Sequence, residues 1–261
     1  MRLQKNYKRI VVKIGSSLFA GGKNKLDTAL IKDISKQISD LMREGKEVVL
    51  VSSGAIALGM SILKLNKRPK ELPGLQATAA IGQHELMHVY RQALAKYKLN
   101  CAQLLLTWDD FLAHRYVNAK NTLNTLLKLK CVPIINENDT VATEEIKFGD
   151  NDKLSAMVAI LVDADLLIVL SDVDGLLDKN KKVVPIVSSI NSEIKSLACP
   201  TSKKTTVGGM ITKIQAAHIA VEAGVVCVIA NGHKKGIIKQ VADNPYSSGT
   251  IFTTLKTRHR R

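Results

Sequence analysis

Short apolar runs recur along this chain, and between them lie longer stretches whose apolar residues repeat with the period of an α-helix. The runs are continuous and rich in Val and Ile, which is typical of strands buried on both faces of a parallel sheet. Strands are predicted at residues 9–14, 47–52, 101–105, 132–135, 166–170 and 225–230. Helices are predicted at residues 28–44, 75–94, 113–129, 154–163 and 213–223. This alternation predicts a doubly wound α/β domain, in which ligands bind beyond the carboxyl ends of the strands.

Capping and turn residues agree with these boundaries. Asp27 or Thr28 is placed to cap the first long helix, and Gly45 is placed to end it. Pro69, Pro73 and Gly74 predict a loop. No long Ser/Gly/Pro linker and no internal repeat interrupts the pattern, so two lobes must share one sheet or pack without a tether.

Length and composition favour a soluble globular protein with a core of ordinary size, since 46% of the 261 residues are hydrophobic. The longest apolar stretch, residues 154–170, contains Asp163 and Asp165, so no membrane helix is predicted. The basic N-terminus leads into a first strand rather than a secretory signal. Four cysteines without a Cys-x-x-Cys pair indicate reduced thiols in a cytoplasmic protein.

The chain is strongly basic, with a net charge of +15. Such a balance permits either nucleic acid or an anionic small molecule as a partner. The basic residues are scattered, apart from a cluster at 256–261, and aromatic residues make up only 4% of the chain with no basic residues interleaved. A solvated basic surface is therefore the favoured interpretation, with nucleic-acid binding as the alternative.

Small residues follow the first two predicted strands, and the first strand carries a lysine near its end. Lys13 precedes Gly15, and Ser53 precedes Gly54. Glycine lets the backbone approach a ligand closely, and a following helix N-terminus favours anions, so both turns are candidate anion cradles. Tight turns alone would explain either one, but Lys13 favours a phosphate. Neither a P-loop nor a dinucleotide fingerprint occurs in the chain.

Amides and carboxylates gather after the strand predicted at 132–135. Asn136 and Asp139 belong to the first group, and Asn151 and Asp152 to a second group beside a helix start. Aspartates suit an ammonium group, and asparagines with backbone N–H groups suit a carboxylate. Metal binding is the competing hypothesis, although the pattern lacks the calcium-loop spacing. Turn and cap chemistry is the structural alternative.

Two later turns suit a nucleotide. Ser171 and Asp172 end the strand predicted at 166–170. A glycine turn then opens the last long helix with a lysine in its first turn, a combination of N–H groups, helix dipole and ammonium that suits a triphosphate. This turn consists of Val207, Gly208, Gly209, Met210, Ile211, Thr212 and Lys213.

One motif points to a different chemistry. His84, Glu85 and His88 match His-Glu-x-x-His, the zinc-protease helix motif. No third ligand follows at a usual spacing, and the flanking residues indicate an amphipathic packing helix, so zinc is not favoured. A serine nucleophile elbow is also absent from the sequence.

Taken together, these motifs resemble those of the glutamate 5-kinases in the amino-acid kinase superfamily. The resemblance runs in order over essentially the whole chain, through residues 11–17, 52–59, 135–139, 148–156, 172–176, 208–213 and 248–250. The segments 136–139 and 148–152 separate glutamate 5-kinases from acetylglutamate, carbamate, uridylate and aspartate kinases better than the lysines do.

The resemblance implies a three-layer α/β/α sandwich with a mostly parallel central sheet. One kinase domain would span residues 1–261, with glutamate in a lobe at about 1–160 and ATP in a lobe at about 161–261. The implied reaction transfers a phosphoryl group from ATP to the γ-carboxylate of L-glutamate, the first step of proline biosynthesis. Family members are typically magnesium-dependent, homo-oligomeric and inhibited by proline.

The resemblance also assigns roles to single residues. Lys13 and Lys213 would flank the transferring phosphoryl group, and Asp152 would orient them. Glutamate would be bound by Ser53, Asp139 and Asn151, with Asn136 and Gly54 nearby. ATP would be held by Lys13, Gly15, Ser171, Asp172 and the segment from Val207 to Lys213. Mg²⁺ would bind the ATP phosphates, with Asp152 as the candidate carboxylate near it.

Two features depart from the family pattern. Many members carry a C-terminal PUA domain, whereas this chain stops soon after Thr250, so we expect a kinase core without that module. Val207 stands where a small hydroxyl residue is common. A kinase acting on another carboxylate, carbamate or phosphate is the alternative with the same fold.

Overall fold

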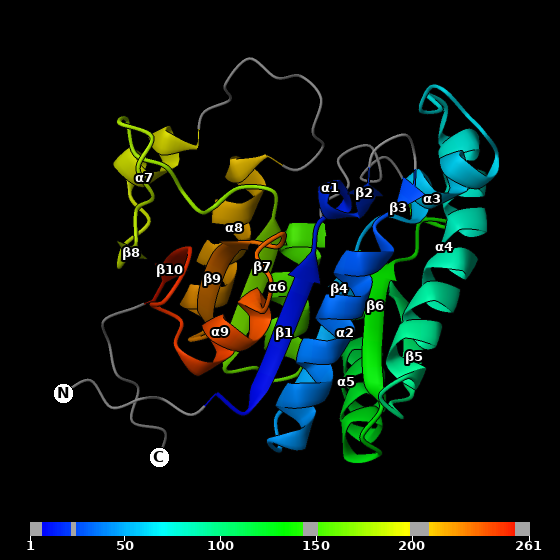
Figure 1. Ribbon diagram of the computed structural model, residues 1–261, viewed down its shortest axis with the longest axis horizontal. Coiled ribbons are helices and arrows are strands. Elements are labelled where there is room, and N and C mark those ends of the chain that lie inside the picture. The colour runs from blue at the N-terminus through cyan, green and yellow to red at the C-terminus, as the bar shows by residue number, and fades with distance from the viewer. Residues whose placement is uncertain (1–6, 22–24, 143–150, 199–208, 254–261) are drawn as a thin grey trace.

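The computed structural model describes residues 7–21, 25–142, 151–198 and 209–253. Within these ranges eight strands form one sheet in the order β5-β6-β4-β1-β7-β9-β10-β8, drawn in Figure 1. The strands are β1 (Arg9–Ile14), β4 (Glu47–Ser52), β5 (Cys101–Leu106), β6 (Val132–Glu137), β7 (Leu166–Ser171), β8 (Ile186–Val187), β9 (Val226–Asn231) and β10 (Thr250–Phe252). A separate ribbon pairs β2 (Ala20–Gly21) with β3 (Lys25–Leu26).

The main sheet is parallel from β5 to β9, and its last two strands reverse. β10 pairs antiparallel with β9 and parallel with β8. The helices are α1 (Ser16–Phe19), α2 (Thr28–Arg43), α3 (Ala55–Ile62), α4 (Leu72–Ala95), α5 (Ala113–Lys128), α6 (Asn151–Leu161), α7 (Ser192–Leu197), α8 (Met210–Glu222) and α9 (Ile237–Asp243), with a 3₁₀ turn η1 at Trp108–Phe111.

Helices cover both faces of the sheet. Ile10 and Val12 of β1 belong to an apolar cluster with α2, α4 and α9. Val11 points to the opposite face and joins a second cluster with α5, α6 and α8. Because the central strands are buried on both sides, they are mostly apolar, as a parallel sheet between two helical layers requires. The predicted three-layer α/β/α sandwich is confirmed. No helix in the described ranges is long and apolar enough to cross a membrane.

Local sequence signals located most of the elements that surround the site. All six predicted strands and all five predicted helices are present. The side chain of Asp27 caps α2 by accepting from the amides of Ala29 and Leu30, each at 3.0 Å, and Gly45 follows that helix with φ +80°. The short helices α3 and α9 and the strands β8 and β10 were not predicted, because elements of two to eight residues carry too little periodicity.

The predicted loop is confirmed at Pro69 and wrong at Pro73 and Gly74, since the last two residues lie in the first turn of α4. Proline is tolerated there because the first amides of a helix have no intrahelical partner. The rest of α4 then crosses α3 at very short range. A β-carbon on Gly59 would lie 1.9 Å from the Thr78 carbonyl oxygen, and one on Gly82 would lie 1.8 Å from the Ala55 carbonyl oxygen.

This crossing leads to a stability prediction. We expect Gly82→Ala to lower the free energy of unfolding by at least about 1–3 kcal/mol, because the added methyl group must push two helix backbones apart. Gly74→Ala, on the same helix, is the control and should be near neutral, since its β-carbon would meet only Pro69 side-chain carbons at 3.1 Å and beyond. Urea unfolding of both variants measures the difference, and equal stabilities would contradict it.

Candidate active site

The candidate site lies where the chain changes direction across the sheet. β1 pairs with β4 on one side and with β7 on the other, and the chain passes from β1 to β4 and later crosses from β6 to β7. Such a switch point opens a crevice for ligands. The turn after β4 contacts the end of β1, since the Ser53 amide donates to the Ile14 carbonyl at 3.1 Å. The turn after β1 contacts the end of β7, since the Gly15 amide donates to the Leu170 carbonyl at 3.3 Å.

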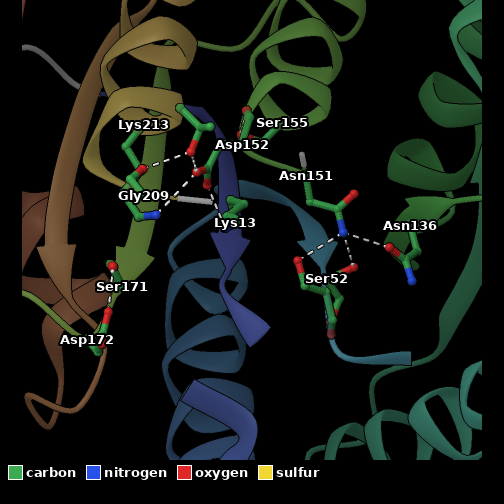
Figure 2. Close-up of polar contacts among 12 residues, drawn as sticks. Lys13, Ser52, Asn136, Asn151, Asp152, Ser155, Ser171, Asp172, Gly209 and Lys213 are labelled. Carbon is green, nitrogen blue, oxygen red and sulfur yellow. Dashed lines mark hydrogen bonds and ion pairs between the residues drawn. The ribbon is translucent and has the colours of Figure 1, made fainter. Parts of the chain in front are cut away.

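Two lysines share one carboxylate at this edge, as Figure 2 shows. Lys13 Nζ on β1 lies 2.5 Å from Asp152 Oδ1, and Lys213 Nζ on α8 lies 3.2 Å from Asp152 Oδ2. All three side chains are buried, with exposed fractions of 7%, 8% and 2% for Lys13, Lys213 and Asp152. One carboxylate therefore fixes two ammonium groups that come from opposite halves of the chain.

The charge states follow from this arrangement. Burial alone would raise the pKa of Asp152, but Lys13, Lys213 and the hydroxyl of Thr212 hold it below its usual value. Burial lowers the pKa of Lys213, and the nearby Lys13 charge lowers it further, while Asp152 and Asp172 oppose the decrease. The cluster holds two ammonium groups against one carboxylate, so it is suited to receive an additional anion.

The start of α8 is attached to the same carboxylate. Thr212 Oγ1 donates to Asp152 Oδ2 at 2.7 Å and lies 2.8 Å from the Gly209 carbonyl oxygen. Met210 and Ile211 occupy the first turn of this helix. Gly15 faces the cluster from the position just after β1, where a β-carbon would stand 3.5 Å from Lys13 Nζ and 3.3 Å from the Leu170 carbonyl oxygen. A glycine there keeps the Lys13 ammonium open to a ligand.

A second, amide-rich group lies beside the lysines. The Asn151 side-chain nitrogen lies 2.9 Å from Ser53 Oγ, 2.8 Å from Asn136 Oδ1 and 3.1 Å from the Ser52 carbonyl oxygen. Gly54 closes the turn with φ +108° and precedes α3, a conformation that favours glycine. The structure thus brings Ser53, Gly54, Asn136 and Asn151 together.

Asp139 lines a small recess that Gln83 and Asn138 also line. Burial raises the pKa of Asp139 to about 6, against the opposing effect of Arg68. The carboxylate therefore changes charge close to neutral pH. A half-buried acid at the rim of a recess is a candidate for holding a cationic group.

The carboxyl ends of β7 and β9 carry the third group. Ser171 Oγ donates to Asp172 Oδ1 at 3.1 Å. Asp174 Oδ1 accepts from Asn231 Nδ2 at 3.2 Å and from Lys234 Nζ at 2.7 Å. In the strand order, β7 and β9 lie on one side of β1, and β4 and β6, which carry the amide group, lie on the other. The groups after β7 and β9 are therefore separated from the amides by β1.

Some site predictions fall outside the described ranges, and some neighbours were missed. Val207 and Gly208 lie outside them. Sequence reasoning did not single out Gln83, which hydrogen-bonds to Asn136, or the contact between Thr212 and Asp152. The only sequence signal for Gln83 is a polar residue on the buried face of an amphipathic helix.

The His84 and His88 pair lies on α4, a packing helix that buries Leu86 and Tyr90. His84 is exposed. Among the described residues, no group of three or more His, Cys, Asp or Glu side chains is arranged to hold a metal ion.

Comparison with known proteins places this geometry in context. The amino acid kinase family matches residues 8–231. A glutamate 5-kinase from Clostridium acetobutylicum is 46% identical over 254 residues, covering 95% of each chain. Another from Caldanaerobacter subterraneus subsp. tengcongensis is 46% identical over 255 residues, covering 95% of this chain and 68% of that enzyme.

Among solved structures, the N-acetylglutamate synthase from Neisseria gonorrhoeae, complexed with coenzyme A and L-arginine, superposes with a TM-score of 0.69 at 17% identity. The match covers 97% of this chain and 62% of the synthase, and it shows a shared fold.

Proposed function

This chain belongs to the amino acid kinase family and resembles its glutamate 5-kinases along nearly its whole length, and on that basis we propose that it phosphorylates L-glutamate. The reaction transfers the terminal phosphoryl group of ATP to the γ-carboxylate and yields γ-glutamyl phosphate and ADP. This is the first step of proline biosynthesis. The observation that carries the proposal is the pair of buried ammonium groups of Lys13 and Lys213 held on Asp152.

The chemistry of the reaction suits these residues. Phosphoryl transfer depends mainly on positioning and on stabilising the charge that develops on the transferring group. The attacking γ-carboxylate is already ionised at neutral pH, so the reaction needs no general base. We assign charge stabilisation to Lys13 and Lys213, and the orientation of both lysines to Asp152.

We assign the two substrates to the two sides of the lysine pair. Glutamate binds at the amide group, through Ser53, Asp139 and Asn151, with Asn136 and Gly54 nearby. ATP binds over Gly15, Ser171, Asp172 and the start of α8, including Val207 and Gly208. The proposed lobes, at about 1–160 and 161–261, meet at the central pair of strands, β1 and β7.

Magnesium belongs to the proposal as an ion carried by the ATP phosphates, where it neutralises charge and orients the nucleotide. Asp152 is a poor ligand for it, because both oxygens of that carboxylate already contact lysine ammonium groups. Asp172 is exposed beside Ser171 and is the better-placed carboxylate. We therefore assign to Asp172 the contact near the metal–nucleotide complex.

The direct test is ADP release by the purified chain with MgATP and L-glutamate. Hydroxylamine added to parallel reactions traps an acyl phosphate as a hydroxamate. N-acetylglutamate, aspartate, carbamate and UMP serve as competing acceptors. We expect ADP and γ-glutamyl hydroxamate in equal amounts with glutamate alone. Turnover with a different acceptor in place of glutamate would overturn the proposal. So would the absence of turnover with every acceptor in a folded sample.

Family membership supports three further properties, which we include in the proposal. These are assembly into homo-oligomers, inhibition by proline and a cytoplasmic location. Light scattering on the purified protein tests the first, addition of proline to the ADP assay tests the second, and cell fractionation tests the third. A monomer, full activity in excess proline or a membrane-bound fraction would remove the corresponding property.

The proposed glutamate site makes a pH prediction through Asp139. Its pKa is raised to about 6, so the carboxyl group loses its charge as the pH falls through that value. If it holds the α-ammonium group of glutamate, KM for glutamate should rise about tenfold between pH 7 and pH 5, with KM for ATP much less affected. Asp139→Asn should have a raised KM that no longer depends on pH in this range. A parallel pH dependence in this variant would exclude the role.

A further inference from the structure

A chain of four side-chain amides runs from the candidate glutamate site to the far edge of the sheet. Asn151 Nδ2 donates to Asn136 Oδ1 at 2.8 Å, and Asn136 Nδ2 donates to Gln83 Oε1 at 2.8 Å. Gln83 Nε2 then donates to Gln103 Oε1 at 3.3 Å. The residues come from α6, β6, α4 and β5. The first three amides donate in the same direction, away from Asn151, and Gln103 is the last acceptor.

The contacts of the side-chain nitrogen decide which atom Asn151 presents to the site. Its nitrogen is directed at three oxygen atoms of the protein. Its oxygen Oδ1 is buried, and within the part of the chain that the structure describes no group donates to it. In Figure 2 this oxygen points away from the contacts of the nitrogen. The reverse orientation would set the oxygen against the Ser52 carbonyl and Asn136 Oδ1, which is unfavourable.

A buried acceptor without a donor is costly unless a ligand supplies the donor. Of the polar groups of glutamate, its two carboxylates are acceptors at neutral pH and only its α-ammonium group donates. The Asn151 oxygen therefore suits the ammonium group. This assignment differs from the prediction that asparagine side chains would bind a carboxylate.

We propose that Gln83 is a positioning residue that supports Asn151 in this acceptor role. The proposal rests on the proposed function, since glutamate is taken as the substrate. Gln83 is 8% exposed, accepts from Asn136 and donates to Gln103. The Asn136 oxygen also accepts from the Glu137 amide at 2.9 Å. Without Gln83, the buried nitrogen of Asn136 loses its acceptor, so the amide that contacts Asn151 is held from its oxygen side alone.

The position of Gln83 is itself well defined by the fold. It follows Gly82, where a β-carbon would lie 1.8 Å from the Ala55 carbonyl oxygen of α3. Because α3 starts directly after the Gly54 turn of the candidate glutamate site, the contact between α3 and α4 fixes the distance from Gln83 to that turn. The packing of these two helices therefore affects the position of the amides that contact Asn151.

The test compares Gln83→Leu with wild type, using L-glutamate as substrate and glutarate as a competitive inhibitor that lacks the ammonium group. We expect KM for glutamate to rise roughly tenfold, the size of one lost hydrogen bond to a charged group. The inhibition constant of glutarate and KM for ATP should stay within about twofold, the scatter expected where no contact is lost. Gln83→Glu keeps an acceptor for Asn136 and should restore part of the loss.

Gln37→Leu is the matched control for a merely structural loss. Gln37 is a buried glutamine on α2, where its side chain donates to Asp33 at 2.6 Å and accepts from the Lys239 amide at 3.1 Å. It should lower the melting temperature with no change in KM. Equal increases for glutamate and glutarate in Gln83→Leu, or no change in either, would overturn the role of Gln83. A wild-type enzyme that does not turn over glutamate would instead overturn the proposed function.

Discussion

Replacing Lys13 or Lys213 with alanine is expected to lower kcat by about 10²–10³, the usual effect of removing one preorganised charge contact from a transition state. Both ammonium groups are buried beside Asp152 and come from β1 and α8, which lie on either side of the crevice. The charge on the transferring phosphoryl group is greatest in the transition state, so the loss should appear in kcat more than in KM for glutamate.

The measurement is steady-state ADP release by each variant, after circular dichroism has established that the variant is folded. Lys239→Ala provides the matched control. This lysine also contacts two carboxylates, Glu44 at 2.8 Å and Asp243 at 2.7 Å, but it lies on α9 outside the site. Its kcat should equal that of wild type. Normal turnover in a folded Lys13 or Lys213 variant would refute the role assigned to that lysine.

The second large effect is expected on stability. Asp152→Ala should lower the free energy of unfolding by about 3–5 kcal/mol, because it leaves two buried ammonium groups without their carboxylate. The same change should lower kcat, since Lys13 and Lys213 lose the group that orients them. Lys120→Ala is the control, because the exposed pair of Lys120 with Asp163 at 2.8 Å should contribute only about 0–1 kcal/mol.

The stability loss in Asp152→Ala should depend on pH. In the wild type the pKa of Asp152 is lowered, so its stabilising contribution is present above the ordinary carboxyl range and is lost as the pH falls below it. In Asp152→Ala, burial lowers the pKa of Lys213 without the opposing carboxylate. The deficit relative to wild type should therefore shrink as the pH rises from neutral toward the lysine range. A deficit that stays constant over this range would show that the loss comes from packing rather than charge.

Local patterns in the sequence were enough to predict the layered α/β fold and the strand ends that carry the site. The strands were predicted because burial on both faces requires apolar runs such as residues 166–170. The glycines and polar residues after those runs were recognised because few residue types tolerate such turns. Lys13, Asp152 and Lys213 were singled out by motif, each from its own segment.

Only the tertiary structure decided how these segments meet. Asp152 and Lys213 are 61 positions apart, and their contact depends on the strand order, which places β7 beside β1 and α6 beside α8. The roles of Gln83 and Asn151 depend on the direction of hydrogen bonds among four separate elements. A side-chain amide carries its donor and its acceptor on the same carbon, so the sequence shows that an amide is present but not which atom faces the ligand. The hydrogen-bond partners that tertiary packing places around the amide determine its orientation.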